Sequence, residues 1–116
     1  MPTIKHEGIK IDLDDEGYLV NFEDWSEKIA CALADREGVS KECPLTKERM
    51  DILKFIRVYY KQYNSLPIIR YVCKNVHQER ECGYEQFIDP LKAWKIAGLP
   101  KPIGYVKHEL KSPPSP

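Results

Sequence analysis

The sequence has none of the long apolar stretches that a membrane-spanning helix requires. Its uninterrupted apolar runs cover only a few residues, whereas a helix needs about 20 residues to cross a bilayer. Residues 1–6 contain no apolar stretch of the kind found in secretory signals, so we expect a cytoplasmic protein. With 116 residues, 42% of them hydrophobic, the chain has the size and composition of one folded domain.

The chain also lacks net charge. Eighteen Lys and Arg residues balance eighteen Asp and Glu residues, which excludes a generally cationic nucleic-acid-binding protein. The charges are nevertheless unevenly placed. Residues 1–37 hold four basic and ten acidic side chains, whereas residues 91–116 hold five basic and one acidic. We therefore expect the basic C-terminal end to dock on the acidic body or on an anionic partner.

Motifs for nucleotide binding and nucleophilic catalysis are missing as well. The six glycines do not cluster between an expected strand and helix, which excludes a phosphate-binding or dinucleotide-binding loop. The three histidines, His6, His77 and His108, are scattered, so no nucleophile and base can be paired from their order in the chain. We expect neither an enzyme nor a bound cofactor.

The four cysteines form no pair with the short spacing of a redox or metal motif. Without a secretory signal we expect a reducing compartment, in which the cysteines are predicted to be free thiols. Cys73, His77 and Cys82, with Cys43 as a fourth ligand, could bind zinc, but this spacing is not one of the usual ones. We favour core packing for Cys73 and a surface thiol at Cys82, and predict no metal site.

Hydrophobic periodicity predicts a mainly α-helical domain. Alternating apolar and polar residues over 4–13, on both sides of Gly8, predict a β-hairpin. Helical spacing predicts helices between Trp25 and Gly38 and over roughly 47–63, 68–77 and 90–97, with a further helical turn over 84–88. The expected architecture is a small orthogonal helical domain with an N-terminal hairpin and an extended C-terminal arm. The domain spans residues 1–106 with the arm at 98–106, and the proline-rich extension at 107–116 is predicted to be disordered.

The most informative segment is residues 92–106, with the sequence KAWKIAGLPKPIGYV. The run IAGLPKP at 96–102 resembles the C-terminal signature of the DsrC/TusE family, the gamma subunit of dissimilatory sulfite reductase and its tRNA-thiolation relative. Further motifs resemble the same family in the same order: Gly17-Tyr18-Leu19, Trp25-Ser26, Glu37-Gly38, FIRxYY at 55–60, and Pro67-x-Ile69-Arg70. The resemblance covers residues 4–106 and implies the fold of that family.

The resemblance also implies a role in sulfur handling. Family members carry sulfur as a persulfide or trisulfide on a penultimate cysteine of the C-terminal arm, and some have a second cysteine further upstream. In this sequence Tyr105 and Trp94 stand at those two positions. A phenol ionises near pH 10 and carries no sulfane sulfur, and an indole offers only an N–H donor. The resemblance therefore implies a binding or regulatory protein of a sulfur-relay or sulfite-reductase system that has lost the arm thiols.

The residues expected to bind a partner lie in and near the arm. Lys92, Lys95 and Lys101, together with Arg70, are predicted to form a basic surface for an anion or an acidic protein. Trp94 and Tyr105 are predicted to pack against the body and hold the arm on it. The full predicted set is Arg70, Lys92, Trp94, Lys95, Gly98, Leu99, Pro100, Lys101, Pro102 and Tyr105.

Two alternatives remain open from the sequence. The chain could carry sulfur on a relocated thiol, with Cys82 in a polar loop as the first candidate and Cys43 as the next. It could also be a DNA-binding regulator, because the helices expected at 47–63 and 68–77 are joined by a short turn, as in a helix-turn-helix motif. Arg70 and Lys74 would then lie on the second helix.

Overall fold

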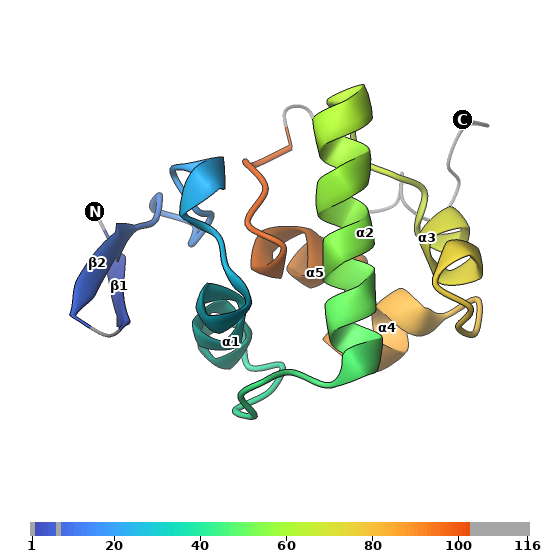
Figure 1. Ribbon diagram of the computed structural model, residues 1–116, viewed down its shortest axis with the longest axis horizontal. Helices are drawn as coiled ribbons and strands as arrows, with labels where there is room; N and C mark the ends of the chain where they lie inside the picture. Colours follow the sequence, from blue (N-terminus) through green and yellow to red (C-terminus); the bar gives the residue numbers. More distant parts are fainter. Residues whose placement is uncertain (1, 7, 103–116) are drawn as a thin grey trace.

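The structure is a computed structural model that describes residues 2–6 and 8–102 of the chain (Figure 1). In chain order the elements are β1 (Thr3–His6), β2 (Ile9–Asp12), the 3-10 helix η1 (Phe22–Asp24), α1 (Glu27–Arg36), α2 (Lys47–Tyr63), α3 (Ile69–Asn75), α4 (Cys82–Phe87) and α5 (Pro90–Ile96). The mainly helical class and the N-terminal hairpin are thereby confirmed. The predicted arm residues 103–106 and the extension at 107–116 lie outside the described residues.

The hairpin forms where apolar and polar residues alternate. β1 and β2 pair antiparallel, with Ile4 opposite Ile11, and Gly8 in the turn between them has φ +81°. An isolated bridge between Leu13 and Leu19 continues the pairing beyond the strands. Ile11, Leu13 and Leu19 are buried, and β1 packs on α1, so the hairpin rests on the helical body as expected.

Helix starts follow from capping residues in the sequence. The Ser26 hydroxyl accepts a hydrogen bond from the backbone N–H of Ile29 at the start of α1 (3.2 Å). The Thr46 hydroxyl does the same for the N–H of Arg49 at the start of α2 (3.3 Å). At α5, Pro90 lies in the first turn, where its missing N–H costs no helical hydrogen bond. The predicted bounds of the longest helix are confirmed. They could be read from the sequence because the capping residue, Thr46, directly precedes the helix.

The core lies around α2, which packs against α3, α4 and α5, while α5 also contacts α1 and α4. Its inner side carries Met50, Ile52, Leu53 and Ile56, all buried. The largest side chains with almost no exposure come from every part of the described chain: Leu13, Leu33, Ile52, Leu53, Val72, Phe87, Ile96 and Leu99. Among the helices of residues 2–6 and 8–102, none is long and apolar enough to span a membrane.

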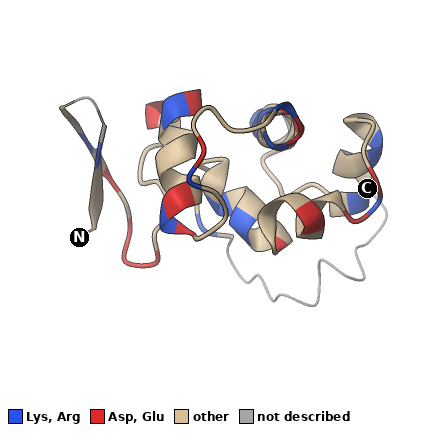
Figure 2. Ribbon diagram, turned by 90° about the horizontal axis from the view of Figure 1, so that it is seen from below, with Lys and Arg blue, Asp and Glu red and all other residues tan. Residues whose placement is uncertain are grey.

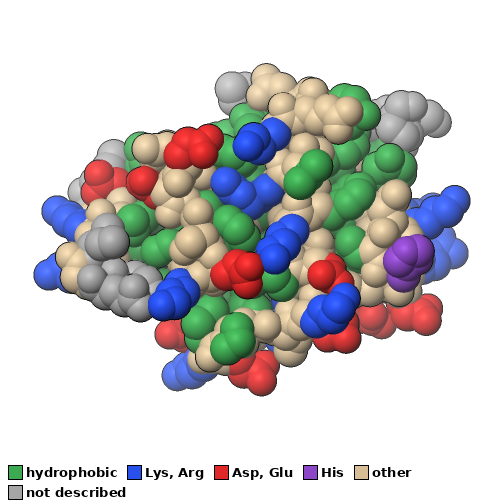
Figure 3. Space-filling view, viewed as in Figure 1, with side chains coloured by type: hydrophobic (Ala, Val, Ile, Leu, Met, Phe, Trp, Pro, Cys, Tyr) green, Lys and Arg blue, Asp and Glu red, His purple; other side chains and the backbone are tan. Residues whose placement is uncertain are grey.

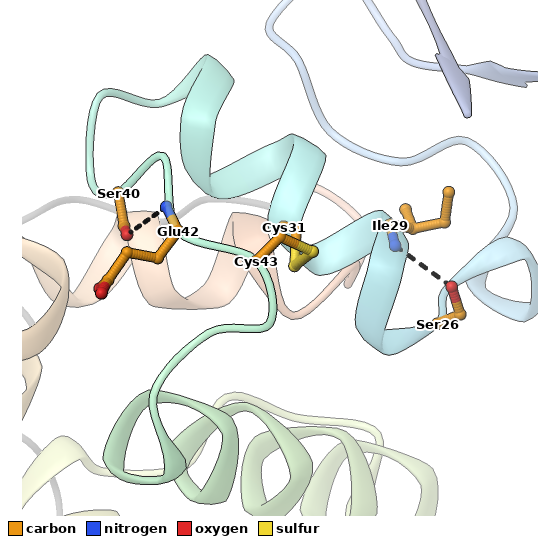
Figure 4. The surroundings of a disulfide bond; sticks show 6 residues. All are labelled: Ser26, Ile29, Cys31, Ser40, Glu42 and Cys43. Carbon is orange, nitrogen blue, oxygen red and sulfur yellow. Dashed lines mark hydrogen bonds between the residues drawn. A yellow bond between two sulfur atoms is a disulfide. The ribbon is translucent and has the colours of Figure 1, made fainter. Parts of the chain in front are cut away.

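The prediction of free thiols is wrong, because all four cysteines form disulfides. Cys31 is bonded to Cys43, with 5.5 Å between their Cα atoms (Figure 4). Cys73 is bonded to Cys82, with 5.7 Å between the Cα atoms. The first pair forms because the chain after α1 turns back along that helix, and the second because α3 packs on α4.

The second disulfide also corrects the predicted environment of Cys82. This residue starts α4 and is 1% exposed, so it is not the surface thiol that the sequence suggested. Its sulfur is bonded to Cys73, and the described residues contain no group of three or more His, Cys, Asp or Glu side chains able to hold a metal ion.

Candidate functional site

The segment that contains the informative motif is folded against the body. We call residues 96–102 the arm base; they begin at the last residue of α5 and run between the η1–α1 region and α2 (Figure 1). Trp94 is 3% exposed, and its ring meets the ring of Tyr60 edge-on, with 5.7 Å between centroids. The Trp94 indole N–H donates a hydrogen bond to the carbonyl oxygen of Pro100 (2.7 Å). Trp94 therefore holds the chain that follows its own helix, and Leu99 is fully buried beside it.

A glycine allows the arm base to approach Trp25 closely. Gly98 has φ +77°, and a Cβ atom there would lie 2.5 Å from Cδ1 of Trp25 and 3.0 Å from Cδ2 of Leu19. Both the backbone conformation and the available space therefore require glycine. Trp25 also donates a hydrogen bond from its indole N–H to the carbonyl oxygen of Ile96 (2.9 Å).

Arg57 of α2 binds the next carbonyl of the same turn. Its guanidinium donates to the carbonyl oxygens of Ala97 (2.9 Å) and Phe22 (3.0 Å). It also stacks on the rings of Phe22 and Trp25, 3.8 and 4.5 Å from their centroids. Burial lowers the pKa of Arg57, but a guanidinium stays charged at neutral pH. The positive charge is favourable here because the carbonyls of a helix C-terminus carry partial negative charge.

Trp25, Arg57 and Trp94 together form what we call the carbonyl clamp. Their side chains donate hydrogen bonds to three carbonyl oxygens of the arm base and of the end of α5. The three donors come from three separate parts of the sequence, so the clamp joins the η1–α1 region, α2 and α5. Ile96 and Ala97 are buried, so either of their carbonyls left without a donor would destabilise the fold by about 1–3 kcal/mol.

Three lysines hold the outer side of the arm base. The Lys95 ammonium donates to the carbonyl oxygen of Glu16 (2.9 Å) and lies 3.4 Å from Oε1 of Glu37. Lys92 donates to the carbonyl oxygen of Glu37 (2.6 Å), with 3.7 Å to the same carboxylate. Lys101 forms an ion pair with Glu16. Within the described residues, the basic C-terminal end therefore does dock on the acidic body, as the charge distribution predicted.

Tyr18 lies beneath this lysine–carboxylate cluster. The Lys95 ammonium is 4.8 Å from the centroid of its ring, and the side chain is buried. Burial raises the pKa of Tyr18 to about 12, with further contributions from the negative charges of Glu16, Asp14 and Glu37. Tyr18 therefore stays protonated at neutral pH and offers no nucleophile.

The predicted site residues are only partly brought together. Seven of them meet in and beside the arm base: Lys92, Trp94, Lys95, Gly98, Leu99, Pro100 and Lys101, with Pro102 following. Arg70 is exposed on α3, which packs on α2 and α4, and it is not among the partners of Glu16 or Glu37. The lysines were predicted to face a partner but are paired with the chain's own carboxylates. Figure 2 shows acidic and basic positions interspersed along the ribbon. Tyr105 lies outside the described residues.

Several residues of this site were not predicted as functional. Trp25, Arg57 and Tyr60 contact the arm base or Trp94 beside it. Glu37 forms ion pairs with Lys92 and Lys95. Each belongs to a short motif that carried the family resemblance: Trp25-Ser26, Glu37-Gly38 and the FIRxYY run. The motifs indicated which residues matter, but only the fold shows that they converge on one segment.

A partly exposed cluster of aromatic side chains lies on α2 and α3, apart from the arm base. The rings of Phe55, Tyr59, Tyr63 and Tyr71 contact one another, with centroids 4.6 to 6.4 Å apart. Tyr63 is 56% exposed and Tyr71 41%, and Figure 3 shows hydrophobic side chains gathered over these helices. Apolar patches of this kind often mark interaction surfaces. Tyr71 of α3 belongs to the cluster, so this helix presents aromatic as well as basic residues. These contacts do not test the DNA-binding alternative, which stays a prediction.

Comparisons with known proteins agree with the fold and with the motifs. The family model described as "DsrC like protein" matches residues 5–106. The chain is similar to the sulfurtransferase TusE of Yersinia pestis, 38% identical over 109 residues, covering 86% of this chain and 96% of the relative. The TusE of Photorhabdus laumondii is 40% identical over 112 residues, covering 89% and 97%. The oxidized gamma-subunit of the dissimilatory sulfite reductase (DsrC) from Archaeoglobus fulgidus superimposes with a TM-score of 0.76 at 35% identity, covering 90% of this chain and 100% of that one.

Proposed function

Because the chain belongs to the DsrC-like family, we propose that it is a binding or regulatory protein of a sulfur-relay or sulfite-reductase system that carries no sulfane sulfur on its arm. One observation carries the proposal. Trp94, at a position that the family resemblance assigns to a cysteine, is buried and hydrogen-bonded to Pro100. A persulfide requires a thiolate, and an indole cannot supply one.

The second cysteine position supports the same conclusion from the sequence. Residue 105 is tyrosine, whose phenol carries no sulfane sulfur. No other cysteine lies beyond Cys82, so the arm as a whole has no thiol. The family's transfer chemistry therefore has no sulfur atom at either of its positions.

The contacts of the arm base support a binding role. The carbonyl clamp and the lysine–carboxylate cluster hold the arm base in one conformation, with Leu99 fully buried. A fixed segment costs less conformational entropy when a partner binds it than a flexible one does. We propose that a protein of the sulfur-relay or sulfite-reductase system recognises the surface of the arm base. We also propose that the chain alone is not an enzyme and needs no cofactor.

The cytoplasm is part of this proposal. In a reducing compartment, glutathione and thioredoxin act on exposed disulfides, whereas buried ones resist reduction. The two disulfides of this chain, one with an exposed cysteine and one buried, would therefore differ in how readily they are reduced.

A relocated thiol is the second candidate, and one observation favours one of its two sites. Cys43 is exposed on the connection between α1 and α2, whereas Cys82 is 1% exposed and bonded to Cys73. If the Cys31–Cys43 disulfide were reduced, Cys43 could accept sulfur, and Cys82 could not without opening the core. Cys43 is therefore the site to test for this alternative.

Partner retention tests the binding proposal. The immobilised wild-type chain is exposed to purified sulfite-reductase subunits and to purified sulfur-relay proteins in separate columns. We expect one of these sets to be retained, and the retention to fall when Lys101→Glu reverses the charge beside Glu16. Lys47→Glu, on the far end of α2 in an exposed pair with Asp51, is the matched control and should bind as the wild type does. Retention of neither set would overturn the proposal.

A further inference from the structure

The two disulfides differ in their access to solvent. Cys73 is 0% exposed and Cys82 is 1% exposed, so this bond lies in the core between α3 and α4. Cys31 is 8% exposed on α1, but its partner Cys43 is an exposed residue. Figure 4 shows the Cys31–Cys43 bond joining α1 to the chain that leads toward α2. A dissolved nucleophile can reach one of the two bonds without opening the core.

The chain around Cys43 is held at its two ends. We call residues 37–46 the α1–α2 connection. Val39 donates its backbone N–H to the carbonyl oxygen of Ala34 (2.9 Å) near one end, and Leu45 is buried near the other. Between them residues 41–44 are exposed, with a local hydrogen bond from the Glu42 N–H to the Ser40 hydroxyl (3.1 Å; Figure 4). Breaking the disulfide would free this exposed stretch from α1 while both ends stay in place.

We propose that Cys31–Cys43 is an exchange site for a nucleophilic sulfur anion, either a thiolate or hydrosulfide, and that Cys73–Cys82 stays oxidised under the same conditions. Exposed disulfides are the labile ones in proteins, whereas a buried one reacts only when the surrounding structure opens. Of the two bonded residues Cys43 is the exposed one and Cys31 is buried, so we place the attack on Cys43, with Cys31 as the leaving group.

The exchange balances without a further reactant. The anion attacks Sγ of Cys43, the S–S bond breaks, and its electron pair leaves on Sγ of Cys31, which takes a proton from water. A thiolate leaves a mixed disulfide on Cys43, and a second thiolate then releases Cys43 and forms the external disulfide. Hydrosulfide instead leaves a persulfide on Cys43. In both cases the α1–α2 connection loses its covalent link to α1.

The regulatory meaning of this exchange rests on the proposed function, although the chemistry does not. Thiolate and hydrosulfide are reduced forms of sulfur, so a sulfur-system protein with this site would change one surface loop in response to their concentration. The carbonyl clamp contains no disulfide, and the arm base would keep its structure. The two parts meet at Glu37, which pairs with Lys92 and Lys95 but precedes the exposed residues 41–44 that the exchange would release.

Differential alkylation of the native full-length chain tests the proposal. One sample of the protein is treated with glutathione and a parallel sample with sodium sulfide. Both are quenched, alkylated and analysed by mass spectrometry of their peptides. We expect Cys31 to become alkylated and Cys43 to carry glutathione or sulfur, at least about tenfold faster than either Cys73 or Cys82 reacts. Opening of both disulfides at similar rates, opening of neither, or an adduct on Cys31 would overturn the proposal. The reagent whose sample contains the adduct, glutathione or sulfide, identifies the nucleophile.

Two controls separate local exchange from unfolding. Trp25 and Trp94 are the two tryptophans of the chain and both contact the arm base, so tryptophan fluorescence should stay unchanged while Cys43 reacts. The Cys31→Ser/Cys43→Ser double variant should give no adduct on residues 73 or 82 over the same time. No partner protein is needed, so failure of the partner retention experiment would leave this result unaffected. A fluorescence change that accompanies the adduct would contradict a local reaction.

Discussion

The arm base and the α1–α2 connection both follow a helix whose end is marked by a glycine in the left-handed region, yet different contacts hold them. Gly98 has φ +77° and Gly38 has φ +74°. In the arm base, three side chains donate to carbonyl oxygens and Leu99 is fully buried. In the α1–α2 connection, residues 41–44 are exposed and a disulfide supplies the covalent link to α1.

This difference shows which part of the molecule can respond to redox conditions. The contacts of the arm base are hydrogen bonds, aromatic packing and ion pairs, none of which a thiol breaks. The attachment of the α1–α2 connection includes a bond that a thiolate can break. We therefore expect the arm base to keep its contacts under reducing conditions and the α1–α2 connection to change.

Replacing Trp94 should destabilise the arm base more than any other single change. Trp94→Ala should lower the free energy of unfolding by about 3–5 kcal/mol, because it removes a buried ring and the donor to the Pro100 carbonyl. Urea unfolding followed by circular dichroism measures the loss. Val39→Ala in the α1–α2 connection is the control and should cost about 1 kcal/mol, since Val39 is only partly buried. Equal losses would show that the two segments are held equally firmly.

Should Trp94→Ala not fold, Trp94→Phe keeps an aromatic ring near Tyr60 and removes only the indole donor. Its expected loss is about 0.5–1.5 kcal/mol, the net value of one hydrogen bond, because Pro100 is exposed and its carbonyl can bind water instead. An unchanged unfolding midpoint for this variant would mean that the hydrogen bond to Pro100 does not hold the arm base.

A smaller effect separates the two glycines. Gly98→Ala should cost about 2–3 kcal/mol, because the new Cβ would add a contact of 2.5 Å with Trp25 to the strain of a positive φ. Gly38→Ala should cost only about 1 kcal/mol, since its φ is similar but no atom lies within 4 Å of the new Cβ. The same urea titration measures both. If Gly38→Ala proved as damaging as Gly98→Ala, close packing would not distinguish the arm base.

The sequence predicted those parts of the molecule that depend on neighbours along the chain. Thr46 caps α2 and the apolar spacing extends to Tyr63, so the bounds of that helix were correct. The disulfides were missed because Cys31 and Cys43 meet only when the α1–α2 connection turns back, which no local spacing encodes. The carbonyl clamp was missed for the same reason, since Trp25 and Ile96 are 71 positions apart.

The site residues divide in the same way. Trp94 was singled out because the motif around it resembles a family in which a cysteine stands there, and it does contact Pro100. That Lys92, Lys95 and Lys101 bind a partner stays a prediction; Lys101 is half exposed, whereas Lys95 is mostly covered. Their carboxylate partners, Glu16 and Glu37, lie far away in the sequence and could not be paired with them from spacing alone.

A sulfane sulfur transfer assay measures whether the chain acts as a sulfur carrier. A cysteine desulfurase is supplied with cysteine carrying radiolabelled sulfur, and delivery to an acceptor protein is measured with the wild-type chain or the Tyr105→Cys variant as the only carrier. The account predicts that the wild type delivers no more sulfur than a reaction without carrier, and that Tyr105→Cys restores delivery by returning a thiol to the arm. Delivery by the wild type at the level of Tyr105→Cys would contradict the account.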